Sequence, residues 1–132
     1  MLALRFAWEL PQNLLGAVVW LVVRRTISET TVEHGRLFFH VPNFGVSLGS
    51  FVFWSSTDHA IIKINPDNKA HEFGHTIQSL YFGPLYLLVI GLPSISRVLY
   101  GTLYYAFTKE KWQGYYAGYP ERWADELGHK FY

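Results

Sequence analysis

The chain has 132 residues, which fits one hydrophobic core, and we expect residues 1–132 to fold as a single domain. Hydrophobic residues make up 50% of the chain and charged residues only 16%, so few side chains are available to cover a surface exposed to water. The net charge is +1 and the basic residues are scattered along the chain, so we expect no nucleic-acid partner. The absence of cysteine excludes disulfides and thiolate metal ligands.

The first predicted element is an apolar helix over residues 10–25. Its central part carries no charge and ends at Arg24 and Arg25. A bilayer crossing that began nearer the N-terminus would have to bury Arg5 and Glu9, which is costly. If the segment does cross, the positive-inside rule favours a cytoplasmic position for its Arg24 end and for the site residues that follow.

Residues 31–64 change character and are predicted to form a small antiparallel meander of three or four strands. Short runs rich in β-branched and aromatic residues occupy residues 37–41, 51–54 and 59–64. Turn-forming residues separate these runs, as expected between neighbouring strands. Because helices are predicted on both sides of the meander, the fold class is α+β.

The next predicted element is a helix over residues 66–82 that carries the sequence His71-Glu72-Phe73-Gly74-His75. Histidines four residues apart lie on one face of a helix, so both imidazoles can bind one metal ion. Glu72 then lies beside that ion and can act as a general base. Gly74 lowers helix propensity, which indicates either the close approach of a ligand or another backbone, or tight helix packing.

Residues 85–107 are predicted to form an apolar, membrane-associated helical hairpin. Between residues 80 and 107 the only charge is Arg97, and Pro93 interrupts the stretch. A buried core helix is the alternative for such a stretch. Membrane association is favoured because so little polar surface remains to cover the domain.

A last short helix is predicted over residues 120–128, closed by Gly128. Glu121 and Asp125 are four residues apart and so share one face of this helix. On a surface helix such a pair is ordinarily solvated. A catalytic Zn²⁺ site needs three protein ligands, however, and this helix offers Glu121, with Asp125 or His129 as alternatives, to complete the set.

The HExxH sequence, followed 46 residues later by a Glu-x-x-Ala-Asp sequence, is similar to the gluzincin zinc metallopeptidases, the thermolysin-like clan. The resemblance implies that the zinc ligands are His71, His75 and Glu121. It also implies that Glu72 is the general base and that Asp125 is the carboxylate that orients the first histidine. It also implies a sheet beside the active-site helix whose edge strand holds the substrate. The chain departs from the family at Pro120, where an asparagine often stands, and in its shorter length.

Other polar residues are candidates for supporting roles. Zincins usually add a tyrosine or histidine that hydrogen-bonds the oxyanion, and the loop before the last helix offers Tyr115, Tyr116 and Tyr119. Three further histidines lie in or beside the meander and are expected to be structural or exposed: His34, His40 and His59.

The metal site restricts how residues 80–107 can meet a membrane. A single crossing would separate Glu121 from His71 and His75 by about 30 Å of hydrocarbon. Both the apolar composition and the metal site are satisfied if the segment turns back at Pro93-Ser94. A zinc site within a spanning helix, as in site-2-type intramembrane proteases, is disfavoured because no aspartate of this chain precedes a glycine.

The predicted function is zinc-dependent hydrolysis of peptide bonds in a peptide or protein substrate by a membrane-associated metallopeptidase. One alternative is a non-catalytic membrane protein stabilised by a metal ion, and another is a hydrolase of a different amide or ester. The presence of Glu72 argues against the non-catalytic, metal-stabilised protein. A purely structural site has four protein ligands and no use for a carboxylate beside an open coordination position.

Overall fold

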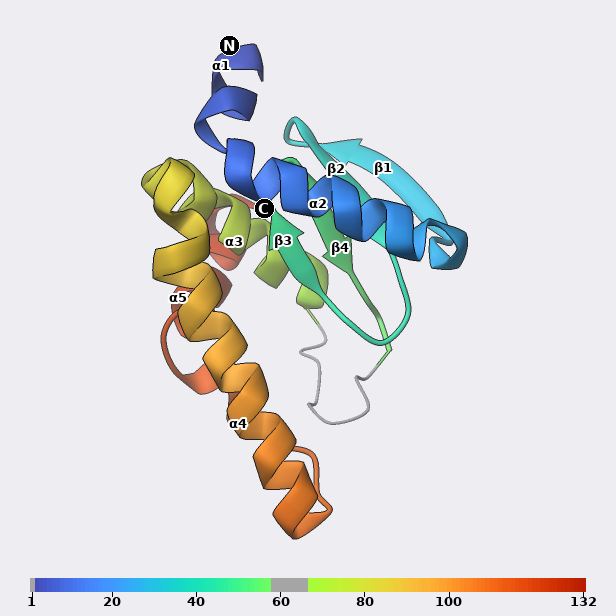
Figure 1. Ribbon diagram of the computed structural model, residues 1–132, viewed down its shortest axis with the longest axis vertical. Helices are drawn as coiled ribbons and strands as arrows, with labels where there is room; N and C mark the ends of the chain where they lie inside the picture. Colours follow the sequence, from blue (N-terminus) through green and yellow to red (C-terminus); the bar gives the residue numbers. More distant parts are fainter. Residues whose placement is uncertain (1, 58–66) are drawn as a thin grey trace.

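A computed structural model describes residues 2–57 and 67–132, and these form the α+β fold expected from the sequence (Figure 1). Two helices come first, α1 (Leu2–Trp8) and α2 (Leu10–Val23). The strands of the sheet are β1 (Glu29–Glu33), β2 (Arg36–His40), β3 (Val46–Leu48) and β4 (Phe51–Trp54). The helices after the sheet are α3 (Asn68–Phe82), α4 (Leu92–Thr108) and α5 (Glu121–Phe131).

The sheet is mixed, so the predicted antiparallel meander was wrong. Within the described residues the strand order is β1-β2-β4-β3, and the central strands β2 and β4 run parallel. In this register Phe38 lies beside Val52 and Phe39 beside Phe53, so the two most apolar strands share the centre, where both faces are covered. The expected run at residues 59–64 lies outside the described residues.

Helices cover the sheet on both faces. Because side chains alternate along a strand, Phe38 points to one face and packs with Phe73 of α3. Phe39 points to the other face, where Val19 and Trp20 of α2 pack against the same cluster. The sheet therefore divides the core into two layers. Helix α3, which carries the HExxH sequence, covers the layer that contains Phe38 (Figure 1).

The polar residues at the start of α2 are buried against protein. Gln12 donates hydrogen bonds to Ser79 Oγ at 2.8 Å and to the carbonyl oxygen of Gly83 at 2.9 Å. Asn13 Oδ1 accepts the backbone N–H of Ser50 at 2.7 Å. These bonds fasten α2 to α3 and to the β3–β4 turn, while the opposite side of α2 is apolar and exposed.

The predicted hairpin over residues 85–107 was also wrong, because the chain is helical without a break from Leu87 to Thr108. A π-helical stretch, η3 (Leu87–Gly91), leads directly into α4, and Pro93 falls in the first turn of α4, where a proline is tolerated. The helix ends at Thr108, and the left-handed backbone of the next residue, Lys109 (φ 61°), turns the chain back. By length and composition this 22-residue helix could cross a membrane, and it is mostly exposed.

The segment 109–120 returns along α4 (Figure 1). Arg97 of α4 donates hydrogen bonds to the carbonyl oxygens of Gly114 at 2.7 Å and Tyr115 at 2.9 Å. The rings of Tyr100 and Trp112 meet edge to face with 4.7 Å between their centres. The reversal that the sequence led us to expect at Pro93-Ser94 therefore occurs after α4, and it brings α5 into contact with α3.

Candidate metal centre

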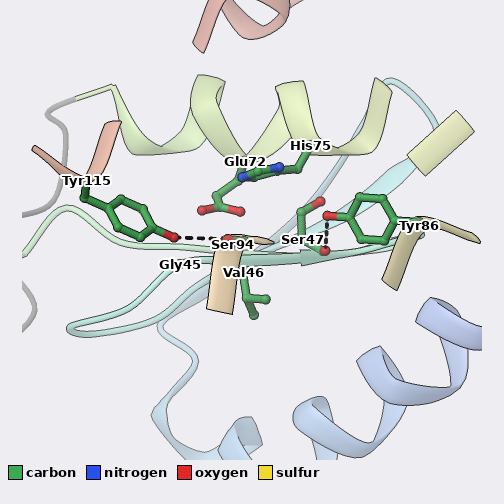
Figure 2. A pocket seen from close by; sticks show the side chains of 8 residues that line it. All are labelled: Gly45, Val46, Ser47, Glu72, His75, Tyr86, Ser94 and Tyr115. Atoms are coloured by element: carbon green, nitrogen blue, oxygen red, sulfur yellow. Dashed lines mark hydrogen bonds between the residues drawn. The ribbon is translucent and has the colours of Figure 1, made fainter. Parts of the chain in front are cut away.

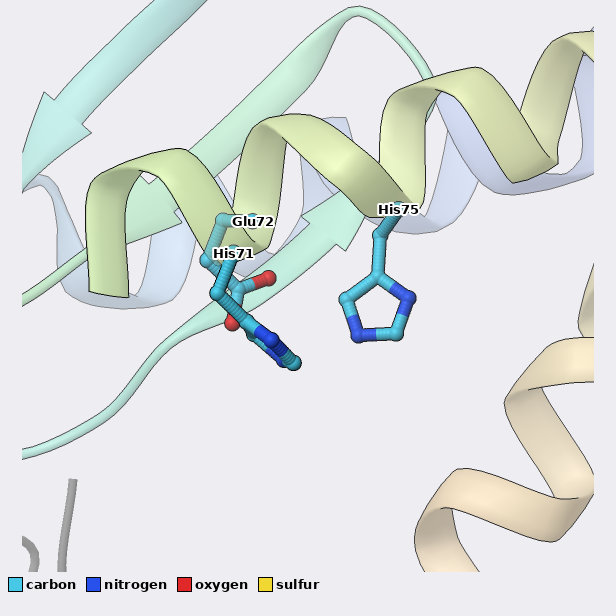
Figure 3. A group of neighbouring side chains, drawn as sticks. All are labelled: His71, Glu72 and His75. Carbon is cyan, nitrogen blue, oxygen red and sulfur yellow. The ribbon is translucent and has the colours of Figure 1, made fainter. Parts of the chain in front are cut away.

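The HExxH sequence lies in the middle of α3 and its three polar side chains are buried. His71, Glu72 and His75 project from the helix toward the same region (Figure 3). One potential ligand atom from each lies within 4.8 Å of the others, so the group could hold a metal ion. Burial of three ionisable groups is expensive unless they are paired or bind a metal, so a functional reason is expected here.

Helix α5 packs closely against α3 because two glycines remove the obstructing β-carbons. A β-carbon at Gly74 would come within 1.8 Å of the carbonyl oxygen of Ala124, and one at Gly128 within 2.1 Å of that of Ala70. Gly74 therefore permits the close approach of another backbone. Gly128 does not close α5 as predicted, because the helix continues to Phe131 and the glycine serves packing instead.

This packing brings Glu121 to both histidines. Its Oε2 lies 2.9 Å from His71 Nε2 and 3.0 Å from His75 Nε2, and the residue is fully buried. The alternative candidate His129 is exposed and instead lies 3.5 Å from Asp67. Among the candidates from the last helix, Glu121 is thus the one that faces both Nε2 atoms.

The opposite ring nitrogens of the two histidines have separate hydrogen-bond partners. Asp125 Oδ1 lies 2.8 Å from His71 Nδ1, and Gln78 Oε1 lies 2.7 Å from His75 Nδ1. Both acceptors bind an Nδ1–H, which leaves each Nε2 directed at Glu121. Gln78 also donates to the carbonyl oxygen of Pro120 at 3.1 Å, which joins α3 to the start of α5.

Sequence reasoning missed Gln78, although its spacing offered a signal. It lies three residues after His75, so on a helix it must share a face with that histidine. In the gluzincin pattern a carboxylate, here Asp125, orients the first histidine, and the pattern contains no corresponding residue for the second.

The chemistry of the donor set fits a metal cation. Two Nε2 atoms and one carboxylate oxygen converge, and such acceptors meet only with a proton or a metal cation between them. Burial lowers the pKa of His71, but hydrogen bonds to Asp125 and Glu121 outweigh burial and raise it to about 10. Burial acts to raise the pKa of Glu121, yet the two imidazoles hold it well below its usual range. Two histidines and a glutamate form one of the ligand sets of catalytic zinc sites.

A small cavity of about 40 Å³ lies beside Glu72 (Figure 2). Its lining comes from the β3 edge, from α3, and from the α4 region with the returning segment: Gly45, Val46, Ser47, Glu72, His75, Tyr86, Ser94 and Tyr115. Two buried atoms in this lining, Glu72 Oε2 and Ser47 Oγ, have no hydrogen-bond partner within the protein. Burial raises the pKa of the Glu72 carboxyl. The cavity has room for a water molecule between polar groups.

The three tyrosines suggested for the oxyanion occupy different positions. Tyr115 lines the cavity, and its hydroxyl lies 3.2 Å from Ser94 Oγ. The ring of Tyr116 packs edge to face on His71, with 4.7 Å between ring centres. Tyr119 is exposed, and its hydroxyl donates to the carbonyl oxygen of Val89 at 2.8 Å. Only the first therefore faces the cavity.

A fourth tyrosine, Tyr86, was not expected from the sequence. It is buried, lines the cavity and donates its hydroxyl hydrogen to the carbonyl oxygen of Ser47 at 2.9 Å. Its place in an apolar stretch gave no indication that its hydroxyl would reach β3.

The remaining histidines are structural within the described chain, as expected. His34 packs against the ring of Phe73 with 4.6 Å between centres. His40 lies between two serine hydroxyls, Ser28 at 2.7 Å and Ser56 at 3.0 Å. His59 lies outside the described residues.

Comparison of the chain with family models, with curated proteins and with solved structures found no match. The likeness to gluzincins therefore rests on the two sequence motifs alone. The described residues contain a buried His71-Glu72-His75 group that could hold a metal ion, and any statement of function rests on this group and its neighbours.

Proposed function

We propose that this protein is a zinc-dependent peptidase in which His71, His75 and Glu121 bind the ion and Glu72 is the general base. The proposal is carried by one observation: both Nε2 atoms lie within 3.0 Å of the same oxygen of Glu121. The carboxylate of Glu72 lines the adjoining cavity and has one oxygen without a partner. A ligand set beside a free carboxylate is the arrangement that metal-assisted hydrolysis requires.

Each residue has a defined task in this mechanism. A bound zinc ion supplies Lewis acidity and lowers the pKa of water toward neutrality. Glu72 accepts a proton from the attacking water in the cavity and delivers it to the leaving amine. Asp125 and Gln78 accept the Nδ1–H of the two histidines, so both Nε2 lone pairs stay directed at the ion.

A peptide substrate is supported by the position of β3. This strand is at the edge of the sheet, and its residues Val46 and Ser47, together with Gly45 just before it, line the cavity next to Glu72. Extended peptides bind to exposed strand edges through backbone hydrogen bonds. A carbonyl group of a peptide that paired with β3 would therefore lie close to the general base.

The test separates catalysis from metal binding. Purified protein is expected to contain one zinc ion per chain, by elemental analysis, and to cleave a mixture of unstructured peptides. Glu72→Gln should keep the zinc and lose turnover, because the amide cannot accept the proton. Metal-free wild-type protein would contradict the proposal, and so would full turnover by Glu72→Gln. Zinc without turnover in the wild type would instead favour a non-catalytic metal-stabilised protein.

We further propose that the protein binds a lipid bilayer through the outer side of the continuous helix formed by η3 and α4. Six large apolar side chains recur there every three or four residues, and each is more than half exposed: Leu88, Leu92, Ile95, Leu99, Leu103 and Phe107. Arg97, the only charge in this stretch, is turned toward the returning segment. An uncharged stripe of this length is typical of a surface in contact with lipid.

The returning segment favours an interfacial position over a full crossing. Residues 109–120 are largely irregular, and unpaired backbone groups in contact with hydrocarbon are strongly unfavourable. Flotation with liposomes tests the proposal. Leu99→Glu, on the stripe, should reduce the lipid-bound fraction, whereas Val32→Glu on β1, where the residue is 71% exposed, should not. Equal behaviour of the two variants would contradict it.

A further inference from the structure

Ser94 lies in the first turn of α4, on the inner side of the helix, next to the candidate metal centre. Its Oγ is 2.5 Å from Glu121 Oε1 and 3.2 Å from the hydroxyl oxygen of Tyr115. It also lines the cavity next to Glu72 (Figure 2). Among the described residues, Ser94 is the only one whose side chain donates a hydrogen bond to Glu121 Oε1.

The direction of these hydrogen bonds follows from the chemistry of the groups. An ionised carboxylate only accepts, so the Ser94 hydroxyl must donate its single hydrogen to Glu121. Ser94 Oγ then has only lone pairs left, and the Tyr115 hydroxyl must donate to it. The result is a chain of two hydrogen bonds, from Tyr115 to Ser94 and from Ser94 to Glu121, that ends on the oxygen facing away from the histidines.

We propose that Ser94 is the residue that positions the third zinc ligand. Its hydrogen bond holds Glu121 Oε1, so that Oε2 alone is presented to His71 and His75. This inference rests on the proposed function, because it assumes that Glu121 binds zinc. Without the hydroxyl, the carboxylate could rotate about its last torsion and share both oxygens between the imidazoles, and the fixed geometry of the site would be lost.

The same bond joins α4 to the metal centre. Ser94 contacts Glu121 from the inner side of α4, while Ile95 next to it points outward on the apolar stripe. The helix that we propose to meet lipid therefore also holds a metal ligand in position.

The test measures zinc affinity by competition with a chelator for four full-length proteins. Ser94→Ala is expected to weaken zinc binding by about 10- to 100-fold, the usual effect of losing a group that orients a ligand. Ser94→Thr keeps the hydroxyl and should bind zinc nearly as the wild type does. Ser96→Ala is the matched control, because Ser96 lies on the same helix, is exposed, and within residues 2–57 and 67–132 its hydroxyl bonds only to the carbonyl oxygen of Leu92.

Two further measurements separate positioning from a general structural role. Thermal unfolding of the metal-free proteins should give similar midpoints for Ser94→Ala and wild type, while the rise in midpoint caused by added zinc should be smaller in the variant. The visible spectrum of the cobalt-substituted protein should change in Ser94→Ala and be restored in Ser94→Thr. If Ser94→Ala does not fold, Tyr115→Phe, which removes only the donor to Ser94, should still show a weaker form of both effects.

Unchanged zinc affinity and an unchanged cobalt spectrum in Ser94→Ala would overturn the inference, and so would failure of Ser94→Thr to restore them. Failure of the proposed function has a different signature. In that case the wild-type protein itself would bind no stoichiometric zinc, and the comparison among the Ser94 variants would show no zinc-dependent difference.

Discussion

The backbone of Gly74 lies directly against the carbonyl oxygen of Ala124, where a β-carbon would approach to 1.8 Å. Ala124 lies on α5 between Glu121 and Asp125, the two carboxylates that contact His71. The distance between α3 and α5 at this point therefore determines how close the carboxylates of Glu121 and Asp125 come to His71. A single methyl group at this position would push the two helices apart against a rigid backbone.

Gly74→Ala should therefore destabilise the protein, even though alanine favours a helix over glycine by about 1 kcal/mol. We expect a net loss of about 1–3 kcal/mol in the free energy of unfolding, the range for overpacking, together with weaker zinc binding. Gly91→Ala is the control, because the nearest atom to a β-carbon there is 3.7 Å away. Urea unfolding and chelator competition measure both effects. An unchanged Gly74→Ala protein would mean that α5 does not depend on this contact.

Glu121 and Asp125 should respond differently to loss of charge. Glu121→Gln removes the negative charge that offsets the dication, so zinc binding should be weakened severely. Asp125→Asn should lower affinity by only about 10- to 100-fold, because Asp125 contacts the Nδ1 side of His71 at 2.8 Å. Titration with zinc against a competing chelator ranks the two variants. The reverse ranking would make Asp125 the third ligand and remove the basis of the gluzincin comparison.

The ion pair between Arg36 and Glu9 should be essential for stability because both side chains are buried. Two hydrogen bonds of 2.6 and 3.1 Å join them, and Arg36 also donates to the carbonyl oxygen of Thr76 on α3. Arg36→Met leaves a buried carboxylate without its partner and should cost about 3–5 kcal/mol.

The double variant Glu9→Met with Arg36→Met should recover part of that loss, since no charge stays buried. Arg122→Met serves as the control, because its pair with Glu126 is exposed and should contribute less than about 1 kcal/mol. Chemical unfolding of the four proteins checks the order. A single variant as stable as the exposed-pair control would show that the buried pair contributes little.

Acid should weaken the contact between β1 and the C-terminal residue. Burial tends to raise the pKa of Glu33, but hydrogen bonds from Lys69, Tyr132 and Thr31 outweigh it and lower the pKa from 4.5 to about 2. A carboxyl group with a depressed pKa stabilises the fold fully above its unfolded value, and this stabilisation is lost as pH falls toward its folded value. The stabilisation by Glu33 should thus persist above pH 4.5 and disappear toward pH 2.

The measurement compares wild type with Glu33→Gln across this pH range. Because Glu33 and Lys69 are partly exposed, the difference in unfolding free energy should not exceed about 1 kcal/mol near neutral pH, and it should vanish near pH 2. Glu126→Gln, at an exposed pair, is the control. A difference that is independent of pH would contradict the assigned role of the Glu33 carboxylate.

The sequence alone determined the elements whose signals are local. Hydrophobic periodicity and turn residues predicted α2, the strands β2 and β4, and α3 close to their observed bounds. The spacing of His71 and His75 likewise fixed their common face, because one turn of a helix relates them wherever that helix packs. These features depend only on residues that are near one another in the chain.

Only the tertiary structure decided what depends on distant residues. The parallel pairing of β2 with β4 follows from the burial of both sheet faces, which local patterns of alternation do not encode. Pro93 suggested a break in the helix. In the first turn of α4, however, the missing N–H of a proline is readily tolerated, so the helix continues without interruption. The roles of Gln78 and Ser94 arise where α3, α4 and α5 meet. Hydrogen bonds between side chains on separate elements require the packing of backbones, and here that packing depends on two glycines without β-carbons.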